Sequence, residues 1–323
     1  MTKDNIVCAG IDTSKRKLDV ALEGRSDQLQ VDNTPDGHRA LSAWLRRHRV
    51  ERIGIEASGG YEQAIVVQLR QDGFLVILFQ PAQVRAYARF HLQRAKNDKL
   101  DAALIAACAA ASKKIHAPAD PRLAPFAQHL TFVEQITDQI ARLKTCRESS
   151  RDPRIRCIWS DEIARLKRLE RLELKQLAAA IRQHRDLAER LELITSVDGV
   201  GLRTAVAILV RLPEIGRVSR EHVAALAGLA PFDDDSGDQI GARHIAGGRE
   251  RLRASLYCAA LPAAFHWNRQ LIVIYRRLIA AGKSHKVALV ACARKLLIYV
   301  NTVVARGTPW VKTPPITSAL ATG

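Results

Sequence analysis

Four acidic residues near the start of the chain constrain its fold more than any other feature. Asp12 and Glu56 each end a short apolar run, and Asp98 and Asp101 stand three residues apart at the start of a predicted helix over 98–112. Positions i and i+3 share one face of a helix, so both carboxylates of that pair point the same way. A fold that uses all four acids together must bring two strand ends and one helix start to the same place.

The first 112 residues alternate between strand and helix patterns. Strands are predicted over 6–11, 18–22, 28–32, 52–55 and 74–79, and helices over 35–48, 61–71 and 98–112. Three hairpin-linked strands followed by strand–helix–strand units predict a mixed sheet with helices on its faces. In an α/β fold of the RNase H-like (RuvC-like) class, the four acids fall where that fold places metal ligands.

Such a group of carboxylates predicts a metal site. Clustered carboxylates repel one another unless a cation neutralises them. Mg²⁺ prefers hard oxygen ligands and keeps waters that a phosphate can displace, and a pair of such ions drives phosphodiester chemistry. We therefore expect Mg²⁺ or Mn²⁺ at Asp12, Glu56, Asp98 and Asp101. For any one of these acids alone, a helix-capping or turn role is the simpler interpretation; four in this order favour the metal site.

Composition indicates a folded intracellular protein of more than one domain. The chain has 323 residues, of which 47% are hydrophobic and 26% charged, as in ordinary soluble proteins. No run of 18 apolar residues and no signal peptide are evident, so we expect no membrane partner. The six cysteines are scattered without a CxxC pair, which favours the reducing bacterial cytoplasm and a nucleoid-associated protein over a disulfide or zinc framework.

The charge predicts a polyanionic partner. The formal net charge is +17, and residues 196–323 carry 17 Lys and Arg against 8 Asp and Glu, which is just over half of the excess. Aromatic residues make up only 5% of the chain, which disfavours a platform for stacking single strands. Contact between basic side chains and the phosphate backbone of double-stranded DNA is the better interpretation.

Three domains are expected, namely 1–125, 126–193 and 194–323. Prolines 118, 121 and 125 mark a linker over 113–130, and the helical pattern after it is expected to break at Pro153 into two long helices. A stripe of apolar residues predicts coiled-coil packing in this region: Ile163, Leu166, Leu169, Leu172 and Leu177. A solvated helical hairpin accounts for most of its charges, and a role in dimer formation is an alternative.

The last domain is expected to be mainly α-helical and to contact nucleic acid. Gly199 and Gly201 precede an apolar helix in the manner of a helix-hairpin-helix turn, where backbone amides hold a phosphate, although a plain tight turn explains them equally well. Ser236 follows in a polar loop near several cations, which would stabilise the transition state of a serine attack on phosphate, although most loop serines only form hydrogen bonds. The basic candidates for phosphate contact are Arg243, Arg249, Arg251, Arg253, Lys283, Lys286, Arg294 and Lys295.

Taken together, these motifs resemble one family, the DEDD-type insertion-sequence transposases, also described as bridge-RNA-guided recombinases. The resemblance runs from about residue 6 to residue 311. The matching stretches are Gly10–Lys15, Glu56–Tyr61, Lys96–Ala102, Gly199–Gly201, Gly228–Pro231, Ser236–Gly237, Gly282–Ala288, Ala293–Leu297 and Gly307–Trp310. Two departures stand beside them: acids occupy 233–235, where the family often has basic residues, and Ala246–Arg249 replaces a more basic stretch.

The resemblance implies a set of expectations. It implies a RuvC-like domain whose four acids, here Asp12, Glu56, Asp98 and Asp101, hold Mg²⁺, and a C-terminal transposase domain whose nucleophile is Ser236. It also implies cutting and rejoining of donor and target DNA through a covalent serine–phosphate intermediate. A structured guide RNA from the element would pair with both DNAs, and the protein would act as a homo-oligomer, either a dimer or a tetramer.

Three other functions fit parts of the sequence. A structure-selective nuclease of the junction-resolvase type would use the acids with water as nucleophile, although the serine loop and the basic C-terminal region argue against it. A sugar-kinase or actin-type ATPase also begins with a strand and an Asp, but no second glycine-rich phosphate loop follows. A silent nucleic-acid-binding protein would not need the intact set of acids.

Overall fold

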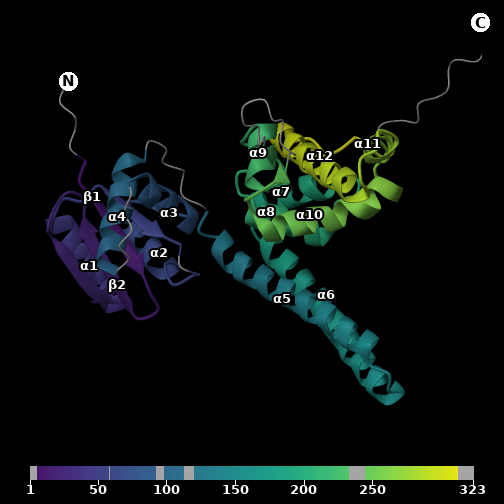
Figure 1. The fold of residues 1–323 in the computed structure, drawn as a ribbon, viewed down its shortest axis with the longest axis horizontal. Coiled ribbons are helices and arrows are strands. Elements are labelled where there is room, and N and C mark those ends of the chain that lie inside the picture. Colours follow the sequence, from purple (N-terminus) through teal and green to yellow (C-terminus); the bar gives the residue numbers. More distant parts are fainter. Residues whose placement is uncertain (1–5, 58, 92–97, 113–119, 233–243, 312–323) are drawn as a thin grey trace, which may run out of the picture. The chain divides into compact units, whose positions relative to one another are not determined.

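The computed structural model describes residues 6–57, 59–91, 98–112, 120–232 and 244–311, without the side chains of 98–100 and 232 (Figure 1). The chain divides into two compact units, Met1–Pro121 and Arg122–Gly323. The long helices after residue 122 therefore belong to the C-terminal unit. Ser236 and Arg243 lie outside the described residues.

The N-terminal unit is built on a five-stranded mixed sheet with the order β3-β2-β1-β4-β5. The strands are β1 (Cys8–Thr13), β2 (Lys17–Leu22), β3 (Gln28–Asp32), β4 (Arg52–Glu56) and β5 (Leu75–Phe79). β1, β2 and β3 are antiparallel neighbours, whereas β4 runs parallel to β1 and β5 runs parallel to β4. This is the order expected of an RNase H-like sheet, because the hairpins join the first three strands and helical crossovers join the rest.

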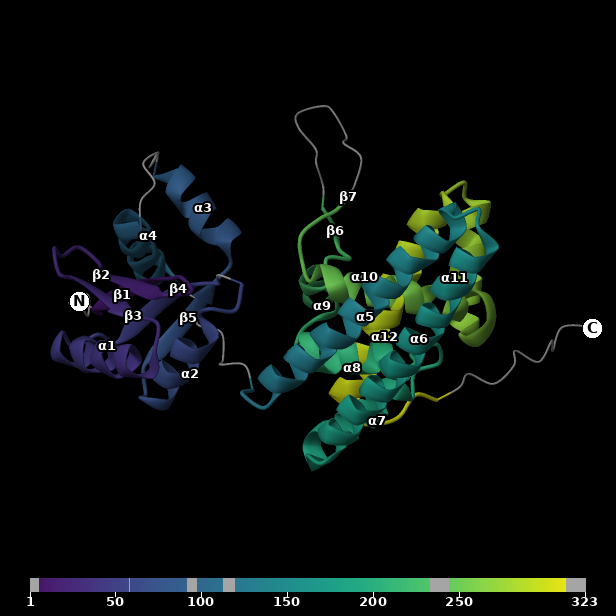
Figure 2. The same cartoon turned by 90° about the horizontal axis from the view of Figure 1, so that it is seen from below.

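Helices cover both faces of this sheet, as Figure 2 shows. They are α1 (Pro35–Arg47), α2 (Gln63–Gln71), α3 (Pro81–Phe90) and α4 (Asp98–Ala111). Ile11 and Ile55 of the sheet pack with α1 and α2 on one face, and Cys8 and Ile77 pack with α3 and α4 on the other. Alternate residues of one strand therefore point to different helix pairs, so an acid's position along a strand decides which helices it faces.

The C-terminal unit is mainly α-helical and has one large hydrophobic core. Its elements are α5 (Leu123–Ser149), α6 (Pro153–Arg182), α7 (Arg185–Thr195), α8 (Leu202–Arg211), α9 (Arg220–Leu226), β6 (Pro231–Phe232), β7 (His244–Ile245), α10 (Glu250–Pro262), the π-helix η1 (Ala263–Trp267), α11 (Arg269–Ala280) and α12 (His285–Arg306). Helix α8 lies at the centre, and its residues from Thr204 to Val210 are all buried. Burial in the core explains why so many successive residues of this helix are apolar.

The linker predicted over 113–130 is shorter than expected. Helix α5 already begins at Leu123, and Pro125 lies in its first turn. The first N–H groups of a helix have no partner within it, so a proline costs little there. The expected break falls before Pro153, which is the first residue of α6, while the Asp152 carboxylate accepts hydrogen bonds from the N–H groups of Arg154 and Ile155.

The coiled-coil stripe predicted on α6 is wrong at Leu172, whose side chain is 52% exposed. Glu173 turns toward α5 instead, and its carboxylate lies 2.8 Å from Nε2 of His129. One turn earlier, Glu170 accepts a hydrogen bond from Thr137 of α5. Near Leu172, polar pairs between α5 and α6 replace the apolar stripe. The spacing of the leucines alone could not reveal this, because it does not show which side of α6 faces α5.

Helix α12 is long and apolar enough to cross a membrane by length and composition, with a mean hydropathy of 1.7 over 18 residues. Half of that window is buried inside the C-terminal unit, where Leu289, Leu296 and Val300 belong to the core. A buried core helix has the same composition as a membrane span, so its packing explains its apolar character.

Candidate active site

Asp12 and Glu56 stand level with each other on two adjacent parallel strands. The register pairs Ile11 of β1 with Ile55 of β4, and each acid is the next residue along its strand. Neighbouring strands are about 4.8 Å apart, and side chains in register leave the sheet on the same face. The two carboxylates therefore share one end of one face, and this is the arrangement that the strand pattern predicted.

That face is covered by α4, which approaches the strands more closely than a helix usually does. Gly10 pairs with Gly54 across β1 and β4. A Cβ added to Gly10 would lie 2.1 Å from the carbonyl oxygen of Ala102, and one added to Gly54 would lie 2.9 Å from that of Ile105. The helix backbone therefore rests directly on the glycine pair, since any side chain there would push it away.

The direction of α4 carries Asp101 toward the other two acids. Arg52, at the start of β4, donates from Nη1 to the carbonyl oxygens of Ala109 and Ser112 at the end of the helix. Four helix residues rise about 6 Å and two strand residues about 6.6 Å. One turn of α4 therefore covers about the same distance as two residues of β4. Arg52 lies at the end of α4 near Ala109, and Gly54 lies under Ile105. One further step in the same direction places Asp101 beside Glu56.

Three of the four predicted acids thus belong to one end of the sheet. Asp12, Glu56 and Asp101 are half-buried, and each has an interaction partner. The side chain of Asp98 lies outside the described residues, although its backbone begins α4. Among the residues that the structure describes, no three His, Cys, Asp or Glu side chains come close enough to hold a metal ion. The donor set fits Mg²⁺ in its chemistry, because it consists of carboxylate oxygens.

The negative charge of Glu56 affects the pKa of Cys108 on the same face of the sheet. Burial and, to a smaller extent, the negative charge of Glu56 raise the pKa of the Cys108 thiol to about 11. Cys108 belongs to α4 and packs in the cluster beneath it. A thiol with a raised pKa stays protonated at neutral pH, in keeping with the apolar packing of Cys108.

A further acid on this face was missed by the sequence analysis. Asp19 of β2 is directly opposite Asp12 in the antiparallel register and is only 7% exposed. Its carboxylate lies 3.2 Å from the Lys17 ammonium and accepts a hydrogen bond of 2.5 Å from Gln30. The alternation within β2 was the available signal, because Leu18 and Val20 point to the other face.

The two predicted hairpin glycines in the C-terminal unit have different surroundings. Gly199 has a φ of +96°, and a Cβ there would lie 2.4 Å from the Cβ of Ala263. Gly201 precedes α8 with an ordinary φ, and a Cβ there would meet nothing within 4 Å. The structure therefore explains Gly199 by packing against η1, while Gly201 leaves the start of α8 open to approach by another molecule.

Several of the predicted phosphate-binding cations are engaged within the chain. Arg249 forms two hydrogen bonds with Glu214, at 3.0 and 2.6 Å. Arg251 lies 3.0 Å from Glu134, and Arg253 donates to the carbonyl oxygen of Gly247. The remaining described candidates are the exposed Lys283, Lys286 and Lys295 and the half-buried Arg294. Charge counting did not separate these groups, because the acids that pair with the arginines are far away in the sequence.

The segment that contains Ser236 begins and ends in a short ladder. Pro231 of β6 pairs with Ile245 of β7, and Phe232 pairs with His244. The residues between them lie outside the described part of the chain. The described structure therefore fixes where the two ends of this segment meet.

Comparison with known proteins defines the class of the chain. A model of DEDD-type IS110 transposases, described as a transposase, matches residues 9–148. A second model, described as the transposase IS116/IS110/IS902 family, matches residues 191–276. The chain is thus a transposase, an enzyme that cuts and rejoins DNA. It belongs to the IS110 family of DEDD-type transposases, which confirms the resemblance found in the sequence.

The chain is also similar to individual proteins and solved structures. The pilin gene-inverting protein of Moraxella bovis is 26% identical over 94% of this chain and 97% of its own length. An uncharacterized 43.6 kDa protein of insertion element IS110 from Streptomyces coelicolor is 32% identical over 36% of this chain and 29% of its own. Among solved structures, T. thermophilus RuvC in complex with a Holliday junction substrate is 20% identical over 32% of this chain and 90% of its own, with a TM-score of 0.26.

Proposed function

We propose that this transposase recombines DNA with Mg²⁺ or Mn²⁺ bound at Asp12, Glu56, Asp98 and Asp101. The observation that carries the proposal is the level placement of Asp12 and Glu56 on parallel strands, with the start of α4 directed to the same end. Bound divalent ions would supply charge stabilisation for a phosphate that gains negative charge during the reaction. The carboxylates of the chain would hold these ions in place and exclude soft metals by their oxygen chemistry.

Ser236 is the proposed nucleophile. Its hydroxyl oxygen would form a bond to the DNA phosphorus while the bond from phosphorus to one strand's oxygen breaks, and the serine proton would pass to that leaving oxygen. A hydroxyl group of the new DNA end would later attack the serine ester, rejoin the DNA and return the serine hydroxyl. This exchange keeps the energy of the phosphodiester bond, which recombination needs. A nuclease that uses water loses it.

Rejoining is also favoured by the full-length similarity to a pilin gene-inverting protein, because inversion of a gene requires every cut strand to be joined again. The acids and Ser236 lie in different units of the chain. We propose that two copies of the chain complete one site together, so that cleavage depends on assembly of an oligomer on DNA. A structured guide RNA is the proposed source of specificity for donor and target, and the intracellular site of action is the nucleoid.

The acids are tested by Asp12→Asn and Glu56→Gln in a cleavage assay on supercoiled DNA that carries the element ends, with and without Mg²⁺. We expect each change to lower cleavage at least 100-fold, because a lost charge weakens metal binding and the field at the phosphate. Asp36→Asn is the matched control, because Asp36 is an exposed acid at the start of α1. Cleavage that persists in both variants, or that resists chelation of the metal, would exclude the metal site.

The serine is tested by mixing two inactive proteins, Ser236→Ala and Asp12→Ala, with DNA and candidate RNA. We expect cleavage to return, with a covalent DNA adduct found only on the Asp12→Ala chain. Ribonuclease treatment should abolish recombination if an RNA guides it. An adduct or recombination with Ser236→Ala alone would disprove the serine assignment, and water would then be the nucleophile.

A further inference from the structure

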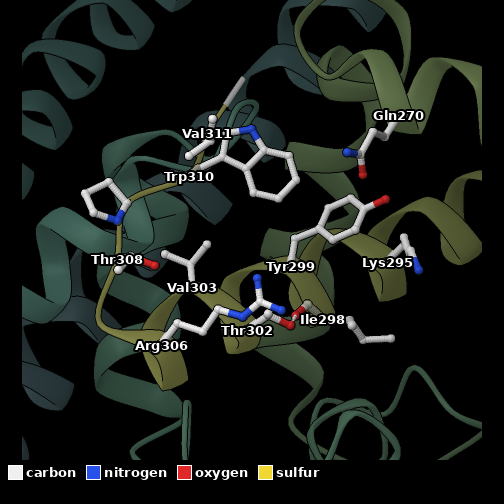
Figure 3. A pocket seen from close by; sticks show the side chains of 11 residues that line it. Gln270, Lys295, Ile298, Tyr299, Thr302, Val303, Arg306, Thr308, Trp310 and Val311 are labelled. Carbon is white, nitrogen blue, oxygen red and sulfur yellow. Dashed lines mark hydrogen bonds between the residues drawn. The ribbon is translucent and has the colours of Figure 1, made fainter. Parts of the chain in front are cut away.

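A pocket in the C-terminal unit is lined by aromatic, basic and polar residues. It has a volume of about 390 Å³, within the range of small-ligand sites, and is formed by one face of α12, by Gln270 of α11 and by the segment after α12 (Figure 3). Its lining includes two cations, Lys295 and Arg306, and no acidic residue. The ligand it fits is therefore anionic or rich in electrons.

Two aromatic rings form the centre of this pocket. The rings of Tyr299 and Trp310 have centroids 5.0 Å apart and are tilted by 43°, and the ammonium of Lys295 lies 5.3 Å from the centre of the Tyr299 ring. Figure 3 shows Gln270 and Lys295 beyond the Tyr299 ring. Few aromatic residues exist in this chain, so their pairing beside a cation is a specific feature, and flat π-systems with a neighbouring positive charge match a nucleobase and its phosphate.

The pocket is built into the fold and not left by a loose chain end. Helix α12 ends at Arg306, and the left-handed φ of +65° at the next residue, Gly307, turns the chain back across the helix. The backbone N–H of Trp310 then donates to Oγ of Ser196, in the turn between α7 and α8, at 2.9 Å. This bond fixes the indole ring against the core, where Trp310 and Tyr299 both pack.

Polar groups at the edges complete the lining. Thr302 of α12, Thr308 and Gln270 are the polar, uncharged residues of the lining, and the Thr302 hydroxyl donates to the carbonyl oxygen of Ile298 at 2.9 Å. Lys295, Tyr299, Thr302 and Arg306 follow one another at helical spacing, so they share one stripe of α12. A base stacked on the two rings would have polar side chains at its edge. Its phosphate would lie near Lys295 at one end of the stripe or near Arg306 at the other.

We infer that this pocket binds an unpaired nucleotide, with its base against Tyr299 and Trp310 and its phosphate near Lys295 or Arg306. The inference rests on the proposed function, since the strand that supplies the nucleotide is one that the recombinase handles. Bases within a duplex are stacked on both sides and do not reach such a site. The pocket therefore reads a single-stranded or flipped nucleotide, whether from RNA or from opened DNA, while other surfaces hold the duplex.

The test measures the Kd of labelled eight-nucleotide RNA and DNA single strands and of a blunt DNA duplex, in EDTA, so that cleavage plays no part. We expect Trp310→Ala and Lys295→Gln to weaken single-strand binding about 5- to 150-fold and about 3- to 10-fold respectively, and to change duplex binding less than twofold. Trp310→Phe should retain most of the binding, because it keeps a ring. Trp267→Ala is the control, because Trp267 is an aromatic residue that is 67% exposed in η1, outside the pocket.

A second measurement does not depend on the fold of a variant. A single strand with one 5-bromouracil, irradiated with the unchanged protein, should cross-link to Tyr299 or Trp310, as peptide mass spectrometry would identify. Stronger binding and cross-linking by the RNA strand would identify RNA as the source of the nucleotide, and the reverse would identify DNA. Cross-links only elsewhere, or equal weakening of duplex and single-strand binding, would overturn the inference. Because these measurements are made in EDTA and read binding alone, a failed pocket remains distinguishable from a failed active-site proposal, which the cleavage assay tests.

Discussion

In the N-terminal unit the backbone positions the acidic residues of the candidate site. In the C-terminal unit carboxylate side chains hold the arginines in place. Asp12 and Glu56 are set by strand register, and α4 is set by direct contact with Gly10 and Gly54. Arginines of the C-terminal unit are held by carboxylates, as Arg211 is by Glu134. Backbone contacts leave little freedom, while ion pairs can exchange one partner for another. The first unit is suited to fixed chemistry, and the second to contact with a long, variable polyanion.

Among the variants that test this comparison, Gly10→Val is expected to have the largest effect on stability. Its side chain would meet the backbone of α4 at Ala102 and Ala106, which cannot move aside as a side chain would. We expect a loss of about 3 kcal/mol in the free energy of unfolding, measured with urea. Gly201→Ala is the matched control, because a Cβ there meets nothing and should change stability by less than about 0.5 kcal/mol. Equal effects at the two sites would show that α4 does not depend on the glycine pair.

An intermediate effect is expected from Arg211→Ala. The Arg211 guanidinium forms hydrogen bonds to both carboxylate oxygens of Glu134, and both side chains are less than one fifth exposed. We expect a loss of about 1–2 kcal/mol, between the values for exposed and buried ion pairs, because Arg251 still neutralises Glu134. Arg220→Ala removes an exposed pair with Glu221 and should have almost no effect on urea unfolding. Similar losses in both variants would contradict a structural role for the buried pair.

A smaller effect should distinguish free cations from engaged ones. Lys283→Gln with Lys286→Gln should lower the slope of log Kd for duplex DNA against log salt by up to about 1.8, because each phosphate contact on duplex DNA contributes about 0.9. Both lysines are exposed. Arg251→Gln should leave the slope unchanged, since Glu134 already engages that side chain. If the slope changed only in Arg251→Gln, Arg251 and not the two lysines would be the residue that contacts DNA phosphate.

The smallest effect concerns pH. Hydrogen bonds from Ser42 and Gln68, together with the charge of Arg46, lower the pKa of Asp72. A folded pKa below the unfolded value of about 3.9 stabilises the protein above that pH, and this stability is lost as the pH falls through the folded pKa. Ser42→Ala should therefore cost up to about 1 kcal/mol at pH 7 and less at pH 3, in urea titrations of the N-terminal unit's transition. The same loss at both pH values would mean that Ser42 acts by packing alone.

The strands of the sheet could be predicted because a strand is a local feature, and Asp12 and Glu56 were selected because each follows an apolar strand pattern. Gln28–Asp32 was predicted with its observed bounds, and the helix from Asp98 ends one residue earlier than expected. Asp19 was missed although the alternation within β2 places it on the face opposite Leu18 and Val20, and its position opposite Asp12 follows from the pairing with β1. Arg249 was selected for its charge, and its partner Glu214 lies 35 residues away, a contact that no sequence pattern indicates. The pairing of Tyr299 with Trp310 depends on a turn at Gly307 and was equally hidden.

The contact of α4 with the glycine pair has a consequence for how this protein tolerates sequence change. Where a helix rests on side chains, every substitution beneath it changes its height above the sheet. Here the closest approach is made by backbone atoms of α4 over Gly10 and Gly54, so a larger residue at either position would lift the helix and its acid away from the strands. Two positions closed to larger residues thus limit how the sequence around this site can change.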